Sequence, residues 1–206
     1  MKVLWVLNKA IGKLAETINI STDGYGGWLD QSLNEIKNDN DLSMVYLTSG
    51  NVSEVKTVSD GKDVYYLVPG GSAYSGFKTS KKNEEIIKGI IDKEKPEIIQ
   101  LWGTESALGS IVASVSRDIP IIVYIQGFMN SIDRNYFEST TEKYLKKHNT
   151  FYDIVKRKSI TKAVKQIKKK AKNERNVLTR ADSIVYDSSW CEAVCKAINP
   201  KITSYT

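Results

Sequence analysis

Two glycines before a predicted helix form the first place where this sequence could bind a ligand. Gly26 and Gly27 follow an apolar strand expected at residues 2–7 and a loop beginning at Asn8, and a helix is expected to begin near Trp28. A helix that begins after a glycine turn presents unpaired backbone N–H groups and a positive dipole end, which suits a phosphate or another anion. The alternative interpretation is a flexible connection that tolerates glycine.

The length of this loop separates the pattern from a dinucleotide-binding fingerprint. Such a fingerprint needs a tight turn directly after the strand and a third glycine inside the helix. Here the loop from Asn8 to Gly27 is long and the third glycine is missing. These two departures disfavour an NAD site. Because long loops within compact domains are usually functional or disordered, the length favours a functional anion-binding loop over a flexible connection.

A second group of candidate residues follows two later apolar strands, expected at residues 97–101 and 121–125. In parallel sheets, ligands gather at the carboxyl ends of the strands. We therefore expect this group to share one rim with the first loop. Its members are Trp102, Thr104, Glu105, Gln126 and Gly127.

These side chains favour hydrogen bonding over proton transfer. Gln126 can donate and accept hydrogen bonds but cannot move a proton at neutral pH. Glu105 stands where a helix begins, so its carboxylate either binds ligand hydroxyls or is stabilised by the helix dipole alone. Thr104 suits an N-cap, and Trp102 either stacks on a ligand or belongs to the core. The only histidine, His148, lies in an irregular basic run, so this chain alone assembles neither a catalytic triad nor a histidine-rich metal site.

Predicted strands and helices alternate along most of the chain. Near-continuous Ile and Val runs in the strands indicate a parallel sheet covered on both faces, an α/β Rossmann-like fold with a β-hairpin insertion turning at Asp60-Gly61. Residues 128–150 show no clear period and predict an irregular excursion with short helical pieces. The remaining expected strands are 42–48, 54–58, 63–68, 182–187 and 201–206, and the expected helices are 28–36, 83–93, 106–116, 151–172 and 188–197. Residues 173–180 are expected either to continue the helix at 151–172 or to start a second one.

Length and composition describe one ordinary globular domain. The chain has 206 residues, of which 41% are hydrophobic. No apolar run reaches the length of a membrane span and no signal-peptide pattern is present, so a cytoplasmic location is expected. Cys191 and Cys195 lack the other ligands that a zinc site needs and are interpreted as buried or idle thiols.

Positive charge is concentrated in one segment. Residues 143–180 hold 14 Lys or Arg against two acids, a balance of +12, whereas the remaining 16 basic and 22 acidic residues give −6. A helix is expected there, with Ile160, Val164, Ile167 and Ala171 in one apolar stripe. The lysines on the other faces allow three interpretations: they face solvent, they bind an anionic membrane surface, or they bind nucleic acid. The last is disfavoured, because the segment lacks the features that would read bases.

Several segments, taken in order, resemble the N-terminal half of a GT-B glycosyltransferase of the retaining glycosyltransferase family 4. They are the Gly-Gly loop, Pro-Glu-Ile-Ile-Gln at 96–100, Ile-Pro-Ile-Ile-Val at 119–123 and Ala-Asp-Ser-Ile-Val at 181–185. Many members have a His-Gly pair where this chain has Gln126-Gly127. The presence of Gln126-Gly127 together with Trp102-Gly103-Thr104-Glu105 instead resembles a subgroup that makes bacterial surface polysaccharides. That subgroup often has an Arg-Thr-x-Trp-Asp pattern, of which this chain retains only Trp190.

The resemblance implies a division of labour between two domains. Residues 1–206 would form a single, truncated acceptor-binding domain of a hexosyltransferase-type enzyme, inactive alone, with the donor-binding domain beyond Thr206. Gly26 and Gly27 would bind the donor phosphates, and the second group of candidates would bind the acceptor or sugar. The resemblance implies neither a metal nor a cofactor, because the nucleotide-sugar is a substrate, and it supplies no catalytic residue.

A noncatalytic α/β binding module remains the alternative. Its basic helix, within residues 143–180, would dock a membrane or a protein partner, and nucleic acid is not expected as a partner. In either case the protein is expected in the cytoplasm, with peripheral attachment to the inner face of the membrane as an option.

Overall fold

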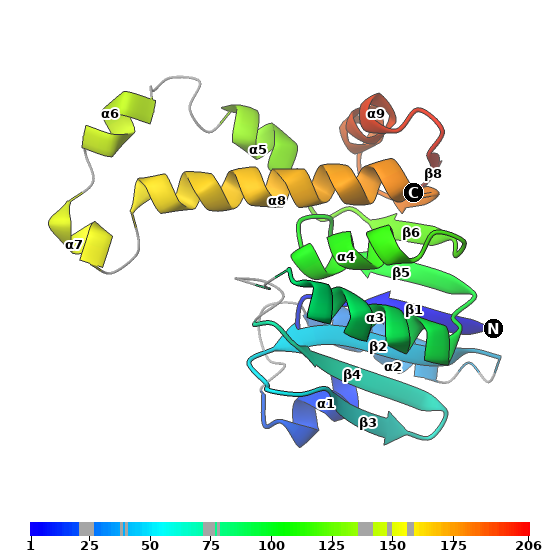
Figure 1. Cartoon of the computed structure of the whole chain (residues 1–206). Coiled ribbons are helices and arrows are strands. Elements are labelled where there is room, and N and C mark those ends of the chain that lie inside the picture. Colours follow the sequence, from blue (N-terminus) through cyan, green and yellow to red (C-terminus); the bar gives the residue numbers. More distant parts are fainter. Residues whose placement is uncertain are drawn as a thin grey trace.

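Within the part of the chain that the structure describes, an eight-stranded sheet forms the centre, in the order β3-β4-β2-β1-β5-β6-β7-β8 (Figure 1). β3 pairs antiparallel with β4, and the other neighbouring pairs are parallel. The strands are β1 (Lys2–Val6), β2 (Ser43–Gly50), β3 (Lys56–Asp60), β4 (Asp63–Pro69), β5 (Ile98–Trp102), β6 (Ile121–Tyr124), β7 (Ser183–Val185) and β8 (Thr203–Tyr205). The computed structural model describes residues 1–20, 27–37, 39, 41–71, 77, 79–135, 142–147, 150–155 and 159–206.

The helices confirm the expected alternation with strands. Those between parallel strands return the chain from the carboxyl edge of the sheet to its amino edge, as a crossover connection requires. They are α1 (Gly12–Thr17), α2 (Gly27–Lys37), α3 (Lys81–Glu94), α4 (Ala107–Val115), α5 (Met129–Asn135), α6 (Glu142–Lys147), α7 (Phe151–Val155), α8 (Ile160–Arg180) and α9 (Ser189–Ile198).

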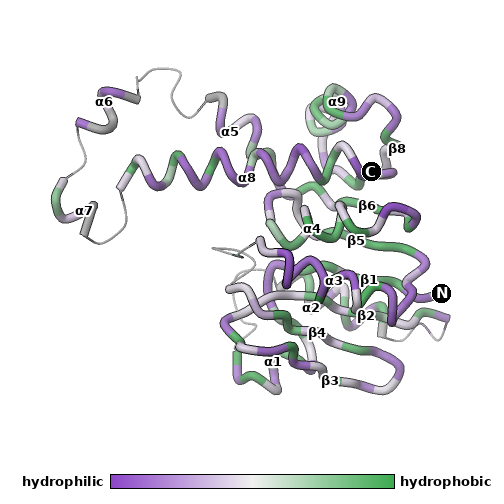
Figure 2. The backbone as a smooth tube through the Cα atoms, in the orientation of Figure 1, coloured by the Kyte–Doolittle hydropathy of each residue, from purple (hydrophilic) through white to green (hydrophobic). Residues whose placement is uncertain are grey.

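The sheet is buried on both faces, as its apolar strands predict. Alternate residues of a strand point to opposite faces, and β1 accordingly sends Leu4 and Val6 into one apolar cluster and Val3 and Trp5 into another. Helices α3, α4, α8 and α9 contribute to the first cluster, and α1 and α2 contribute to the second. Figure 2 shows the central strands coloured as hydrophobic, whereas α8 carries alternating hydrophilic and hydrophobic bands.

Five aromatic side chains form a row across the second face. Trp5 makes edge contacts with Tyr46 and Trp102, with ring centroids 5.7 and 5.0 Å apart. Tyr46 stacks on Tyr65 at 4.4 Å, and Trp102 stacks on Tyr124 at 4.0 Å. The row joins β4, β2, β1, β5 and β6, so it fixes the relative positions of the strands whose carboxyl ends are described below.

The predicted hairpin forms one edge of the sheet. β3 and β4 pair antiparallel from Lys56 with Leu67 to Asp60 with Asp63, around the expected turn. β4 also pairs parallel with β2. The hairpin is therefore continuous with the parallel sheet, because its second strand supplies the next position beyond β2.

The loop expected from Asn8 to Gly27 contains a helix that was not predicted. Helix α1 begins at Gly12, whose φ of +52° favours glycine, and buries Leu14 and Ala15 beside α2. A Cβ at Gly12 would lie 2.7 Å from Leu33 Cδ2, so a larger residue there would also displace the Leu33 side chain. The sequence expectation was wrong here because six helical residues give too short a period to recognise.

The single helix expected over residues 151–172 is instead two helices. Thr150 and Asp153 form a reciprocal capping box at the start of α7, with Asp153 N donating to Thr150 Oγ1 at 3.1 Å. Ser159 caps α8 by accepting from Lys162 N at 3.3 Å. Helix α8 then continues without a break to Arg180, which confirms the first of the two alternatives expected for residues 173–180. The described pieces of residues 128–150, α5 and α6, confirm the predicted short helices.

The first half of α8 extends beyond the sheet. Figure 1 shows it projecting past the carboxyl ends of the strands, accompanied by α6 and α7. We call α6, α7 and residues 160–172 of α8 the basic lobe. None of the helices within the described residues combines the length and apolar character needed to cross a bilayer.

Candidate functional site

Polar side chains converge where three adjacent strands end. Asn8 follows β1, Glu105 follows β5 and Gln126 follows β6, and these strands are neighbours in the sheet. Asn8 Nδ2 donates to Trp102 O and to Glu105 Oε1, both at 3.4 Å. The expected meeting of these strand ends at one rim is thus confirmed. We call Asn8, Gly103, Glu105 and Gln126 the carboxyl-edge cluster.

Gly103 is the backbone position around which this cluster is arranged. Its φ is +94°, a conformation that side chains rarely adopt. A Cβ at this position would lie 3.0 Å from Glu105 Oε2, 3.3 Å from Asn8 Nδ2 and 3.5 Å from Gln126 Oε1. A carboxylate, an amide donor and an amide oxygen therefore surround one small space that only glycine leaves open. Such a set can bind a ligand with both donors and acceptors, such as a polyol.

Gln126 and Gly127 face outward at this rim. Both residues are exposed, and a Cβ at Gly127 would meet nothing within 4 Å. Glu105 is half-buried, and its carbonyl accepts from Asn173 Nδ2 at 3.1 Å. Its backbone is thus fixed by α8 while its carboxylate is fixed by Asn8, which leaves the carboxylate a defined direction at the edge of the sheet.

Trp102 and Thr104 lie beneath the rim. Trp102 is 7% exposed and stacks on Tyr124, which matches the core interpretation of this residue. Thr104 is 1% exposed and donates to Glu174 Oε2 at 2.9 Å. The expectation that Thr104 serves as an N-cap was wrong, because Ser106 caps α4 by accepting from Gly109 N at 2.9 Å.

Glu174 joins three elements behind the site. Its carboxylate is fully buried and accepts from Thr104 Oγ1, from Met129 N at 2.8 Å, from Asn130 N at 2.9 Å and from Asn130 Nδ2 at 2.7 Å. It therefore stabilises the start of α5, the loop after β5 and α8 together. Sequence reasoning missed this role, although Glu174 lies three residues after Ala171 on the apolar stripe, where an acid needs partners.

Of the two glycines predicted to bind an anion, the structure describes only one. Gly26 lies outside the described residues, whereas Gly27 is the first residue of α2. Since α2 leads into β2, which runs parallel to β1, its first residue lies on the carboxyl side of the sheet. The anion-binding role of both glycines stays a prediction. His148 also lies outside the described residues.

The two cysteines are buried, as expected. Burial raises the pKa of the Cys195 thiol to about 12, with smaller contributions from Cys191 and Glu174. A protonated, enclosed thiol is neither a nucleophile nor a metal ligand. Among the described residues, no group of three or more His, Cys, Asp or Glu side chains could hold a metal ion.

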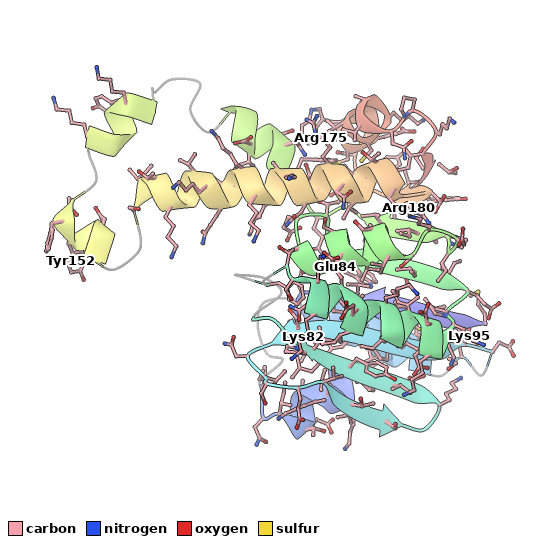
Figure 3. All side chains as sticks on the ribbon, viewed as in Figure 1. Lys82, Glu84, Lys95, Tyr152, Arg175 and Arg180 are labelled. Atoms are coloured by element: carbon pink, nitrogen blue, oxygen red, sulfur yellow. The ribbon has the colours of Figure 1, made fainter. Side chains whose placement is uncertain are left out.

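A separate hollow of about 440 Å³ lies between α5, α8 and α9. Asn130, Arg175, Thr179, Val194 and Ile198 contribute to its lining. Arg175 lies between α5 and α9 in Figure 3 and donates to Asn130 Oδ1 at 3.4 Å. No residue of the carboxyl-edge cluster lines this hollow, so it is distinct from the predicted site.

Similarity to known proteins is detected through the fold alone. No protein-family model and no curated protein sequence matches the chain. Among solved structures, sucrose-phosphate synthase from Thermosynechococcus elongatus aligns with 99% of this chain and 47% of its own, at 10% identity and a TM-score of 0.53. The chain thus spans about half the length of that protein and shares its α/β fold.

Two further structures align with lower scores. The alignment with a trehalose-6-phosphate structure from E. coli, bound with UDP-2-fluoro glucose, covers 95% of this chain and 42% of the E. coli chain, at 8% identity and a TM-score of 0.43. The alignment with a UGT transferase from Siraitia grosvenorii in complex with UDP covers 100% of this chain and 47% of the transferase, at 11% identity and a TM-score of 0.45.

Proposed function

We propose that this chain is the acceptor-side half of a GT-B glycosyltransferase that takes a nucleotide-sugar as donor. The observation that carries the proposal is the alignment of nearly the whole chain with one half of sucrose-phosphate synthase. The ordered segments that resemble glycosyltransferase family 4 support it independently, because they were identified from the sequence. In finer detail, we propose a retaining hexosyltransferase of that family that acts in bacterial surface polysaccharide synthesis.

The carboxyl-edge cluster supplies sugar recognition in this proposal. Glu105, directed by Asn8, accepts hydrogen bonds from sugar hydroxyls, while Gln126 donates and accepts beside it. Gly103 and Gly127 leave room for the sugar. Trp102 and Thr104 act from below, by fixing the strand end that carries Glu105.

The reaction proposed here exchanges one bond at the anomeric carbon. The acceptor oxygen forms a bond to this carbon on the face from which the nucleotide diphosphate leaves, and the hydroxyl proton goes to the departing phosphate oxygen. Backbone amides at Gly26 and Gly27 hold the phosphate charge that develops. The partner domain, proposed to lie outside residues 1–206, holds most of the donor, and no metal is included in the scheme.

The test uses the product of the complete gene and a panel of nucleotide-sugars. Release of the nucleoside diphosphate, with and without glycan acceptors, measures hydrolysis and transfer. We expect Gln126→Ala to raise the KM for the acceptor about 10-fold, since one or two sugar hydrogen bonds are lost. Gly27→Val should reduce kcat while the fold stays intact. Lys82→Gln, on the exposed side of α3, serves as the control (Figure 3). Absence of turnover with every donor would contradict the proposal.

A noncatalytic binding module is the second candidate. The projecting basic lobe favours it, because a docking function needs such a surface and catalysis does not. The two candidates differ in the sequence that follows residue 206 in the gene: a second α/β domain with paired acids favours the enzyme.

A further inference from the structure

The basic lobe concentrates positive charge on one helix face. Exposed lysines of α8 within residues 160–172 recur at intervals of three and four, so they share an arc of about 120°. Val164 and Ala171, which are buried, lie outside this arc. These lysines are Lys162, Lys165, Lys168, Lys169 and Lys172. On α6, Lys143 and Lys147 are exposed as well.

Large aromatic side chains are exposed on the same lobe. Phe151 is 82% exposed and Tyr152 is 67% exposed, both on α7, and Tyr144 on α6 is 57% exposed. Figure 3 shows Tyr152 at the outer end of the lobe, away from the sheet. Exposed aromatics beside a lysine face combine two features of helices that lie at a membrane interface: aromatic rings that enter the headgroup region and cations that attract anionic lipids.

The direction of the lobe relates it to the carboxyl-edge cluster. Asn173 of α8 contacts Glu105 at the end of β5, so residues 160–172 extend past this edge. Figure 1 shows the lobe on the side toward which the parallel strands point. A flat surface in contact with the lobe would therefore lie near the rim that carries Glu105 and Gln126.

We propose that the basic lobe docks the protein on an anionic lipid bilayer, with the lysines of α8 binding headgroups and Phe151 entering the interface. Charge complementarity favours an anionic partner, because each Lys near an anionic surface strengthens binding, and the exposed Phe151 favours a lipid interface that can bury an apolar ring. A single-stranded nucleic acid fits less well, since proteins that bind one typically use a positively charged groove, and the described hollow between α5, α8 and α9 contains no lobe lysine. Docking would present the rim to amphiphilic acceptors, a consequence that rests on the proposed function.

Vesicle cosedimentation of the full chain tests the proposal. Vesicles of phosphatidylcholine alone are compared with equal parts of phosphatidylcholine and phosphatidylglycerol, at low and physiological ionic strength. We expect strong binding only to the anionic vesicles, weakened by salt because exposed charges are screened. The triple variant Lys162→Gln/Lys165→Gln/Lys169→Gln should weaken binding about 100-fold.

Matched variants separate position from net charge. Lys81→Gln/Lys82→Gln/Lys201→Gln removes the same charge from exposed residues outside the lobe and should change binding less than about threefold. Phe151→Ser should weaken binding about 10-fold, and this part of the loss should persist at high salt, since burial of the ring is not electrostatic. Circular dichroism of each variant verifies that α8 is retained.

Three results would overturn the proposal: equal binding to both vesicle types, no binding to either, or equal losses in the lobe and control variants. Tighter binding of a single-stranded oligonucleotide than of anionic vesicles, abolished by the lobe variant, would also overturn it in favour of nucleic acid. Transfer to a water-soluble acceptor does not require docking. Failure of the vesicle assay and failure of the proposed function are therefore distinguishable.

Discussion

The carboxyl-edge cluster and the basic lobe are two polar regions built in opposite ways. At the cluster, each polar group is tied to a different element: Asn8 follows β1 and binds Glu105, which Asn173 of α8 also holds. In the lobe, five exposed lysines share one helix, α8. The comparison teaches that fixed geometry comes from contacts between elements, whereas a charged surface needs only one helix and its period.

The largest expected effect follows from removing Glu174, which supports the cluster from behind. Glu174→Ala leaves Met129 N, Asn130 N and Thr104 Oγ1 without their buried acceptor. We expect a loss of about 3 kcal/mol or more in the free energy of unfolding, measured by urea denaturation. Glu85→Ala, at an exposed position of α3, is the control and should change it by less than about 0.5 kcal/mol. Similar losses in both variants would remove the distinction between the regions.

Substitution of Gly103 or Gly89 by alanine should give the next largest changes in stability, with opposite signs. Gly103→Ala places a Cβ at a φ of +94° and 3.0 Å from Glu105 Oε2, and should destabilise the protein by about 1–2 kcal/mol. Gly89→Ala in α3 meets nothing within 4 Å and should stabilise it by about 0.5–1 kcal/mol. Thermal unfolding measures both changes. If Gly103→Ala were neutral, the cluster would not be closely fitted.

Two serine caps test whether the lobe is coupled to the sheet. Ser106→Ala removes the cap of α4, which lies in the core, and should lower the global free energy of unfolding by about 1 kcal/mol. Ser159→Ala removes the cap of α8 at the outer end of the lobe. There we expect faster amide hydrogen exchange near Lys162 with the global value unchanged. A global loss of equal size in both variants would show that the lobe unfolds with the sheet.

The smallest effect is expected on the lysine face. Lys169→Ala should leave the free energy of unfolding within about 0.5 kcal/mol of the original, because the side chain is exposed. Calorimetry can measure this change. A loss above about 1 kcal/mol would mean that the lysine face supports folding, which would weaken its assignment as a docking surface.

Much of the fold could be predicted because its signals are local. Ile and Val runs with intervening helical periods gave the alternating strands and helices, and Asp60-Gly61 gave the hairpin. Helix α1 was missed because its signal covers less than two turns. The break between α7 and α8 was missed because the capping residue Ser159 comes just before the apolar stripe that begins at Ile160, so the stripe itself shows no interruption. Because β5 and β6 are parallel neighbours in the sheet, Gln126 lies near Gly103, as expected for residues at the carboxyl ends of adjacent strands.

The sequence by itself determined the strands and most of the helices, the segregation of charge into residues 143–180 and the strand ends at which polar side chains gather, because these depend on residue types and their period along the chain. Only the tertiary structure decided that Trp102 lies in an aromatic row, that Thr104 serves Glu174, and that Asn8 directs Glu105. Each of these pairings joins residues 22 to 97 positions apart, and such contacts are fixed by the packing of strands and helices rather than by any local pattern.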